Sequence, residues 1–160
     1  MANEKSPPKG YHSLTPSLAY KGTEEAIAWY KNVFGAKEKM RVDGPDKKVM
    51  HAELTIGDSN FFLAEQNPQY GNKTPQSVNG NSITLHLYVP DVDNTIKKAV
   101  QNGATLLMAP MDMFYGDRIG NIEDPYGYSW ALATHIKDVP ESEMKKMAEE
   151  FKGEPEHQHA

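Results

Sequence analysis

Apolar and polar positions alternate along several short stretches of the chain and follow helical spacing along others. Residues 48–56 (KVMHAELTI) and 82–89 (SITLHLYV) alternate as β-strands do. By contrast, helical spacing relates four apolar residues of one segment: Ala26, Ile27, Tyr30 and Phe34. The chain is therefore predicted to mix short strands with amphipathic helices.

The predicted elements occur in the same order twice. A strand, a helix and three more strands account for residues 11–65, and the same order returns over 82–135. Residues 66–81 between them are polar and rich in Pro, Gly and Asn, which predicts a linker loop. Each helix is predicted to end at a glycine, Gly35 or Gly103. We therefore expect an α+β protein built from two βαβββ modules.

The two ends of the chain lie outside these modules. Residues 1–10 are polar and predict a disordered arm, and residues 136–160 predict a helix over 140–152 followed by a solvated tail. The helix carries one apolar stripe, made by Met144, Met147, Ala148 and Phe151. Such a stripe predicts that the helix docks on the sheet or on a partner subunit.

The two faces of the predicted strands differ in character. One face of each strand is apolar and suits packing against helices; Trp130 falls on this face. The other face carries mostly Thr, Ser, Ala and His, whereas a sheet in bulk water usually carries Lys, Glu and Arg. Small neutral polar groups can bind a ligand without burying much charge. The pattern favours curved sheets around a cavity over a half-exposed sheet that is merely rich in Thr and Ala.

Composition excludes several classes of function. The net charge is −5 and the 17 Lys and Arg residues are scattered, so we expect no nucleic-acid or anionic-membrane partner. Cysteine is absent, which excludes disulfides, a thiolate nucleophile and Cys-ligated metals. No apolar run approaches the ~20 residues that span a bilayer, and the N-terminus lacks the apolar core of a signal peptide. These features predict a soluble, cytoplasmic protein.

Four blocks of sequence resemble the vicinal oxygen chelate superfamily (glyoxalase, bleomycin resistance and dioxygenase proteins), and especially its PhnB-like branch. They are TPSLAYKGTEEAIAWYKNVFGA (15–36), VMHAELTIGDS (49–59), ITLHLYVPDVD (83–93) and GDRIGNIEDPYGYSWALATH (116–135). The closing block, with its Asp-Pro-aromatic-Gly turn, is the most specific. The resemblance implies curved mixed sheets that enclose a pocket for a small molecule, and a homodimer.

Metal enzymes of this superfamily place a His, Gln or Glu ligand on the first and last strands of each module. Counting from the helix-ending glycines carries the first-strand positions to Thr15 and Thr84. The last-strand positions fall at Ala131 and, less securely, at Leu63. None is a convincing ligand, because Leu and Ala side chains cannot coordinate a metal. We therefore expect no metal at the usual site and no cofactor.

A shifted metal site is the alternative. His51 and Glu53 share one strand face, and His86 is predicted to face the same way. Two imidazoles and one carboxylate can hold divalent Fe, Mn or Zn with open positions. The same three residues are equally compatible with hydrogen-bonded cavity or surface positions.

The candidate ligand-binding residues come from the polar strand face and from the turn before residue 117. The strand positions are Thr15, Ser17, Thr84, His86 and Ala131. In the turn, Phe114 or Tyr115 is predicted to stack on a planar ligand. Arg118 would pair with an anionic group of the ligand, or else with a nearby acid such as Asp117 or Glu123.

Two classes of function follow. The first is a binding protein that holds a small organic molecule without an obligatory metal, as antibiotic-sequestering members of the superfamily do. The second is a divalent-metal enzyme of the lyase, isomerase or dioxygenase type that uses His51, Glu53 and His86. A metal-free enzyme with Glu53 or a histidine as its base is a third reading, so the sequence leaves catalysis open.

Overall fold

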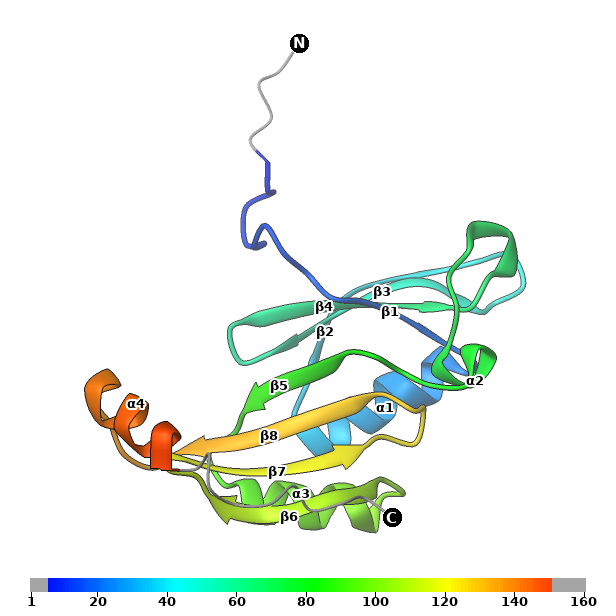
Figure 1. Cartoon of the computed structure of the whole chain (residues 1–160). Coiled ribbons are helices and arrows are strands. Elements are labelled where there is room, and N and C mark those ends of the chain that lie inside the picture. The colour runs from blue at the N-terminus through cyan, green and yellow to red at the C-terminus, as the bar shows by residue number, and fades with distance from the viewer. Residues whose placement is uncertain (1–5, 151–160) are drawn as a thin grey trace.

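The computed structural model describes residues 6–150, which form two four-stranded mixed sheets (Figure 1). The first sheet has the order β1-β4-β3-β2 and holds β1 (Ser17–Tyr20), β2 (Lys37–Asp43), β3 (Val49–Ile56) and β4 (Ser59–Glu65). The second has the order β5-β8-β7-β6 and holds β5 (Thr84–Tyr88), β6 (Thr105–Asp112), β7 (Asp117–Glu123) and β8 (Ser129–His135). In each sheet the first strand is parallel to the last, and the other pairs are antiparallel. The predicted α+β fold of two βαβββ modules is confirmed.

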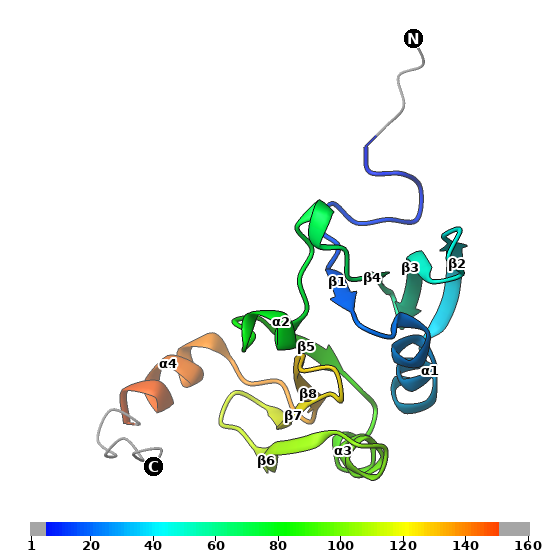
Figure 2. The same ribbon diagram turned by 90° about the vertical axis from the view of Figure 1, so that its right-hand side faces the viewer.

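Two helices cover the apolar faces of the sheets. α1 (Thr23–Phe34) packs on the first sheet and α3 (Val92–Gln101) on the second (Figure 2). Apolar strand residues such as Leu54, Leu63 and Leu132 are fully buried beneath them, as the alternation predicts. α1 ends at Gly35, whose φ of 66° suits glycine.

The last strand of each module also holds the start of that module's helix. The Glu65 carboxylate accepts hydrogen bonds from the backbone N–H groups of Gly22 and Thr23 at the start of α1, at 3.0–3.2 Å. In the second module, Thr134 Oγ1 accepts the N–H of Val92 at 2.9 Å. These contacts satisfy N–H groups that the helix itself leaves unpaired.

The two modules share one hydrophobic core, which includes residues of α1, α3 and both sheets. A buried polar chain runs through it: Tyr20 Oη lies 2.8 Å from Tyr30 Oη, and Tyr30 donates to Asp124 Oδ2 at 2.5 Å. Trp130 Nε1 donates to the same carboxylate at 2.9 Å, and the predicted burial of Trp130 is confirmed. Burial raises the pKa of Asp124, and the hydrogen bonds from Tyr30 and Trp130 only partly oppose this rise.

The segment between the modules contains local structure. A 3₁₀ turn, η1 (Pro68–Tyr70), and one helical turn, α2 (Pro75–Val78), occur where the sequence predicts a loop. Asn67 and Thr74 cap them by accepting backbone N–H groups two or three residues on, and a proline follows each cap. Gln76 Nε2 donates to Tyr126 O at 2.7 Å, which ties this segment to the second module.

The N-terminal segment and the last helix lie beside the modules. The strand predicted from residue 11 begins only at Ser17, after Pro16, which has no N–H to donate. α4 (Glu141–Glu150) stands clear of both sheets (Figures 1 and 2), and Met144 and Met147 on its predicted stripe are only half-buried. Half of the predicted disordered arm (1–5), together with Phe151 and the tail, lies outside the described residues.

No helix in the described part of the chain is long and apolar enough to cross a membrane.

Candidate functional site

A cleft separates the two modules along their first strands. Within the described residues, β1 pairs only with β4 and β5 only with β8, so no strand of this part of the chain pairs with the other edge of either first strand. Two hollows lie between these strands and their flanking residues. The large hollow has a volume of about 630 Å³ and the small hollow about 190 Å³. The cleft therefore lies between the modules, where the sequence predicts a cavity.

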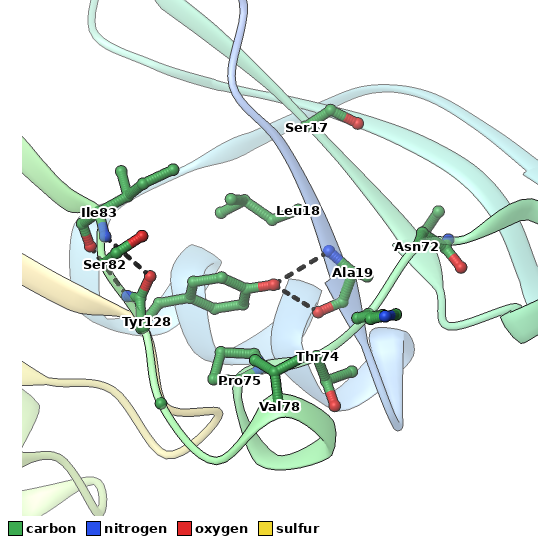
Figure 3. A pocket seen from close by; sticks show the side chains of 14 residues that line it. Ser17, Leu18, Ala19, Asn72, Thr74, Pro75, Val78, Ser82, Ile83 and Tyr128 are labelled. Carbon is green, nitrogen blue, oxygen red and sulfur yellow. Dashed lines mark hydrogen bonds between the residues drawn. The ribbon is translucent and has the colours of Figure 1, made fainter.

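The large hollow is formed by β1, by the linker and by Tyr128 (Figure 3). Tyr128 Oη donates to Ala19 O at 2.7 Å and accepts from Ala19 N at 3.1 Å, so it occupies the free edge of β1 at this point. Burial raises the pKa of the Tyr128 phenol, which keeps its proton at neutral pH. Among residues 6–150, Lys73 is the single charged residue in the lining. The volume lies within the range of sites that bind small organic molecules.

The other lining residues of the large hollow are small polar or apolar groups. Its lining includes Ser17, Leu18, Asn72, Val78, Ser82 and Ile83. Ser82 and Ile83 come from the start of the predicted strand 82–89, and Asn72 and Val78 come from residues 66–81, which the sequence predicts to be a linker loop. The cap signal at Thr74-Pro75 was the local hint that this segment would be ordered. Tyr128 was also missed, because alternation places it on the apolar face.

The small hollow lies at the other end of the cleft. It brings together two predicted ligand-binding residues, Thr15 and His86, with Leu14, Asn60 and Trp130. His86 is exposed and packs against the Tyr88 ring, with ring centroids 4.9 Å apart. With Ser17 in the large hollow, three of the predicted ligand-binding residues line the cleft.

The remaining predicted residues lie elsewhere. Thr84 is exposed at the start of β5 and lines neither hollow, and Ala131 is buried in a small apolar cluster with Ile119. Phe114 and Tyr115 are half-buried in the turn before β7, with ring centroids 5.4 Å apart, and also line neither hollow.

Arg118 has the ion-pair environment that was its alternative reading. Its guanidinium bonds both carboxylate oxygens of Asp93, at 2.7 and 2.9 Å, and one oxygen of Asp112 at 2.9 Å. The nearby acids that pair with Arg118 are therefore Asp93 and Asp112, in place of the named examples Asp117 and Glu123. The register explains the change, because Asp112 lies opposite Arg118 across the β6–β7 ladder.

Comparison with known proteins identifies the family. The model of the glyoxalase/bleomycin resistance protein/dioxygenase superfamily matches residues 12–132. The chain belongs to this superfamily. An uncharacterised protein from Mycobacterium bovis is 38% identical over 136 residues, which cover 83% of this chain and 90% of that protein. An uncharacterised protein from Mycobacterium tuberculosis strain H37Rv is equally similar, with 80% of its length covered.

Several solved structures share the fold. TioX from Micromonospora sp. ML1 has a TM-score of 0.60 at 22% identity, covering 77% of this chain and 98% of that one. A PhnB protein from Bacillus cereus has a TM-score of 0.60 at 21% identity, covering 77% and 99%. A superfamily enzyme from Burkholderia phytofirmans PsJN has a TM-score of 0.60 at 21% identity, covering 75% and 95%. At these identities the likeness establishes the fold and carries no activity across.

The usual metal positions of the superfamily can now be placed in the fold. Thr15 precedes β1, and Thr84 and Ala131 lie on β5 and β8. Leu63 was the least securely placed of the four positions. Its side chain is fully buried in the core beneath the helices, so it does not face a ligand. The neighbours that face the other way on β4 are Phe62 and Ala64, whose side chains also lack donor atoms.

The alternative metal set is divided between the sheets. His51 Nε2 and Glu53 Oε1 are 3.0 Å apart on β3, whereas His86 lies on β5 of the second sheet. Within residues 6–150, no group of three His, Cys, Asp or Glu side chains is arranged to hold a metal ion. A single chain therefore brings together only two of the three residues on which the metal-enzyme hypothesis depends.

Proposed function

We propose that this superfamily member binds a small, mostly uncharged organic molecule in the cleft between its modules, without a metal at the usual site, and that it belongs to the PhnB-like branch. The observation that carries the proposal is the large hollow of about 630 Å³, in which Lys73 is the single charged residue that the described part of the chain contributes. The likeness to the PhnB protein of Bacillus cereus supports the branch.

The lining favours a molecule that combines an apolar body with a few hydrogen-bonding groups. Leu18, Val78 and Ile83 offer apolar surface, and Ser17 and Ser82 offer hydroxyl groups beside it. A multiply charged anion would find only one cation there, so a neutral or singly anionic ligand fits better.

Binding alone accounts for the cleft better than metal chemistry does. The metal-enzyme hypothesis needs His51, Glu53 and His86 around one ion, and the fold places His86 on a different sheet from the other two. A protein that sequesters its ligand needs only a shaped, selective hollow.

The test is a thermal-unfolding screen of EDTA-treated protein against neutral planar antibiotics and small anions. A ligand at a hundredfold excess over its Kd should raise the stability by ~2.7 kcal/mol. Ser82→Trp, which fills the large hollow, should abolish the rise, whereas Ser142→Trp on the exposed surface of α4 should leave it unchanged. A rise that survives Ser82→Trp, or one that requires added Mn, Fe, Co, Ni or Zn, would contradict the proposal.

A further inference from the structure

One edge of β1 forms part of the wall of the large hollow. The carbonyls of Pro16 and Tyr20 accept backbone N–H groups of β4 and of the residue after it, so the even-numbered residues of this strand turn their backbone groups towards β4. The odd-numbered residues turn theirs the other way, since successive residues of a strand present their N–H and C=O to opposite edges. The backbone groups of Ser17 and Ala19 therefore lie on the edge that borders the hollow.

The N–H and C=O of Ala19 already have a partner. Tyr128 Oη accepts from Ala19 N at 3.1 Å and donates to Ala19 O at 2.7 Å (Figure 3). A single hydroxyl thus takes the place that a neighbouring strand would fill at this edge. The contact shows that this edge is satisfied by a group that donates and accepts at once.

Ser17 offers the same pair of backbone groups without such a partner. It is exposed and lines the large hollow, and β1 pairs with no strand on this side within the described residues. No hydrogen bond between residues 6–150 reaches the Ser17 N–H or C=O at this edge. An open strand edge of this kind favours a ligand that holds a donor and an acceptor side by side.

The other wall of the hollow shows which chemical group fits such a pair. Asn81 Nδ2 donates to Ile83 O at 2.9 Å, and Asn81 Oδ1 accepts from Ile83 N at 3.0 Å. Both residues line the large hollow. One primary carboxamide therefore satisfies the N–H and the C=O of a single residue here. The same group on a ligand matches the open pair of Ser17.

We infer that the ligand of the large hollow carries a primary carboxamide, and that the Ser17 N–H and C=O recognise this group at the edge of β1. The inference rests on the proposed function, because it names the chemistry of a ligand for the same hollow. Leu18 and Ile83 offer apolar surface for the rest of the molecule. A ligand that lacks the amide N–H leaves the Ser17 carbonyl unpaired in the complex, which lowers its affinity.

The experiment compares benzamide with acetophenone, which has nearly the same shape and keeps the carbonyl but has a methyl group in place of the amide nitrogen. Each is titrated into the EDTA-treated full chain, and binding is followed by backbone amide NMR shifts. Benzamide should bind about tenfold more tightly than acetophenone, because it alone satisfies the Ser17 carbonyl. The Ser17 amide should shift in the complex, and Ser82→Trp, which fills the hollow, should abolish binding of both molecules.

Two variants separate the backbone of Ser17 from its side chain. Ser17→Pro removes the N–H at the open edge, where a sheet tolerates proline, and should weaken benzamide binding about tenfold. Ser17→Ala keeps both backbone groups, so it should bind benzamide as the parent does and with the same preference over acetophenone. Loss of that preference in Ser17→Ala would show that the hydroxyl recognises the ligand and that the inference is wrong. If Ser17→Pro does not fold, the two ligands on the parent and on Ser17→Ala decide the matter.

The outcomes distinguish this inference from the proposed function. Equal affinity for benzamide and acetophenone would overturn the carboxamide assignment and leave the hollow as a binding site. Benzamide that binds only away from Ser17, or does not bind, would overturn it too, whereas the thermal-unfolding screen judges the proposed function separately. Hydrogen exchange of the Ser17 amide that slows with protein concentration in the ligand-free chain would show that a second copy covers this edge instead.

Discussion

The two modules have the same strand order and the same pattern of strand pairing, so their equivalent residues can be compared one by one. Glu65 and Thr134 do the same task in the two modules, since each bonds the start of the following helix. Phe62, three residues before Glu65, lies opposite Glu53 in the β3–β4 ladder. Ala131, three residues before Thr134, lies opposite Asn121 in the β7–β8 ladder. Glu53 and Asn121 therefore occupy the same place on the outer faces of the two sheets, where the outer face of a sheet is the one turned away from its helix.

These two equivalent residues are satisfied very differently. Both oxygens of Glu53 are hydrogen-bonded, one by Tyr11 and the other by His51. Asn121 Oδ1 is buried and has no hydrogen-bond partner among residues 6–150. The difference teaches that the shared backbone fixes where a polar group sits, whereas its partners depend on the side chains that surround it in each module. In the first module, Tyr11 of the segment before β1 supplies one of these partners and His51 of β3 the other.

The largest expected effect concerns the hairpins, which also differ between the modules. The first module joins β3 to β4 through the exposed pair Gly57-Asp58, whereas the second joins β7 to β8 through a longer turn with Asp124 buried. Asp124→Ala should lower the free energy of unfolding by about 3 kcal/mol, because Tyr30 and Trp130 lose their acceptor within the core. Urea unfolding measures it.

The equivalent hairpin provides the control for that variant. Asp58→Ala should change the free energy of unfolding by less than about 0.5 kcal/mol, since the side chain is exposed. Similar losses in the two variants would show that the hairpins do not differ in this way. Two separate unfolding transitions in the unmodified chain would show that the modules do not share one core.

A smaller effect is expected at Glu53. Glu53→Gln should lower the free energy of unfolding at pH 7 by about 2 kcal/mol, because two charge-assisted hydrogen bonds are weakened. The pKa of Glu53 is lower in the folded than in the unfolded chain, so its contribution is present above the unfolded value and is lost as the pH falls through the folded value.

The difference in stability between the parent and Glu53→Gln should therefore shrink below about pH 4. Asp124 has the opposite sign, since burial raises its pKa and protonation relieves the cost of its buried charge. Unfolding curves of the parent and of Glu53→Gln between pH 3 and 7 measure the effect. If the difference in free energy of unfolding between these two proteins grows as the pH falls, the lowered pKa assigned to Glu53 is wrong.

Local sequence pattern predicts most of the fold. The alternating stretches 48–56 and 82–89 contain β3 and β5, because each strand has one face against the core and the other turned away from it. The pattern fails where a residue's partner is not local. The first strand was extended back to residue 11, although Tyr11 turns onto Glu53 instead of continuing the ladder.

The site depends on contacts that no local pattern contains. Tyr128 and Ala19 are 109 positions apart, Tyr11 and Glu53 are 42 apart, and both pairs meet only once the sheets have formed. Thr15, Ser17 and His86 could be placed in the cleft because they lie on or next to the first strand of each module. The linker residues that line the large hollow could not be placed from the sequence, since a polar segment can cross a sheet in many ways.

The smallest effect, and the sharpest test of the comparison, is expected at Asn121. Replacing a buried polar group that has no partner by an apolar one of similar shape removes a desolvation cost and breaks no bond. Asn121→Leu should therefore leave the free energy of unfolding unchanged or raise it by up to about 1 kcal/mol. Glu53→Leu, the matched change in the first module, should lower it, because Tyr11 and His51 both lose their partner. Urea unfolding of the two variants side by side decides the matter. If Asn121→Leu is as destabilising as Glu53→Leu, then Asn121 has a partner of its own, and the outer faces of the two modules are alike where they now differ.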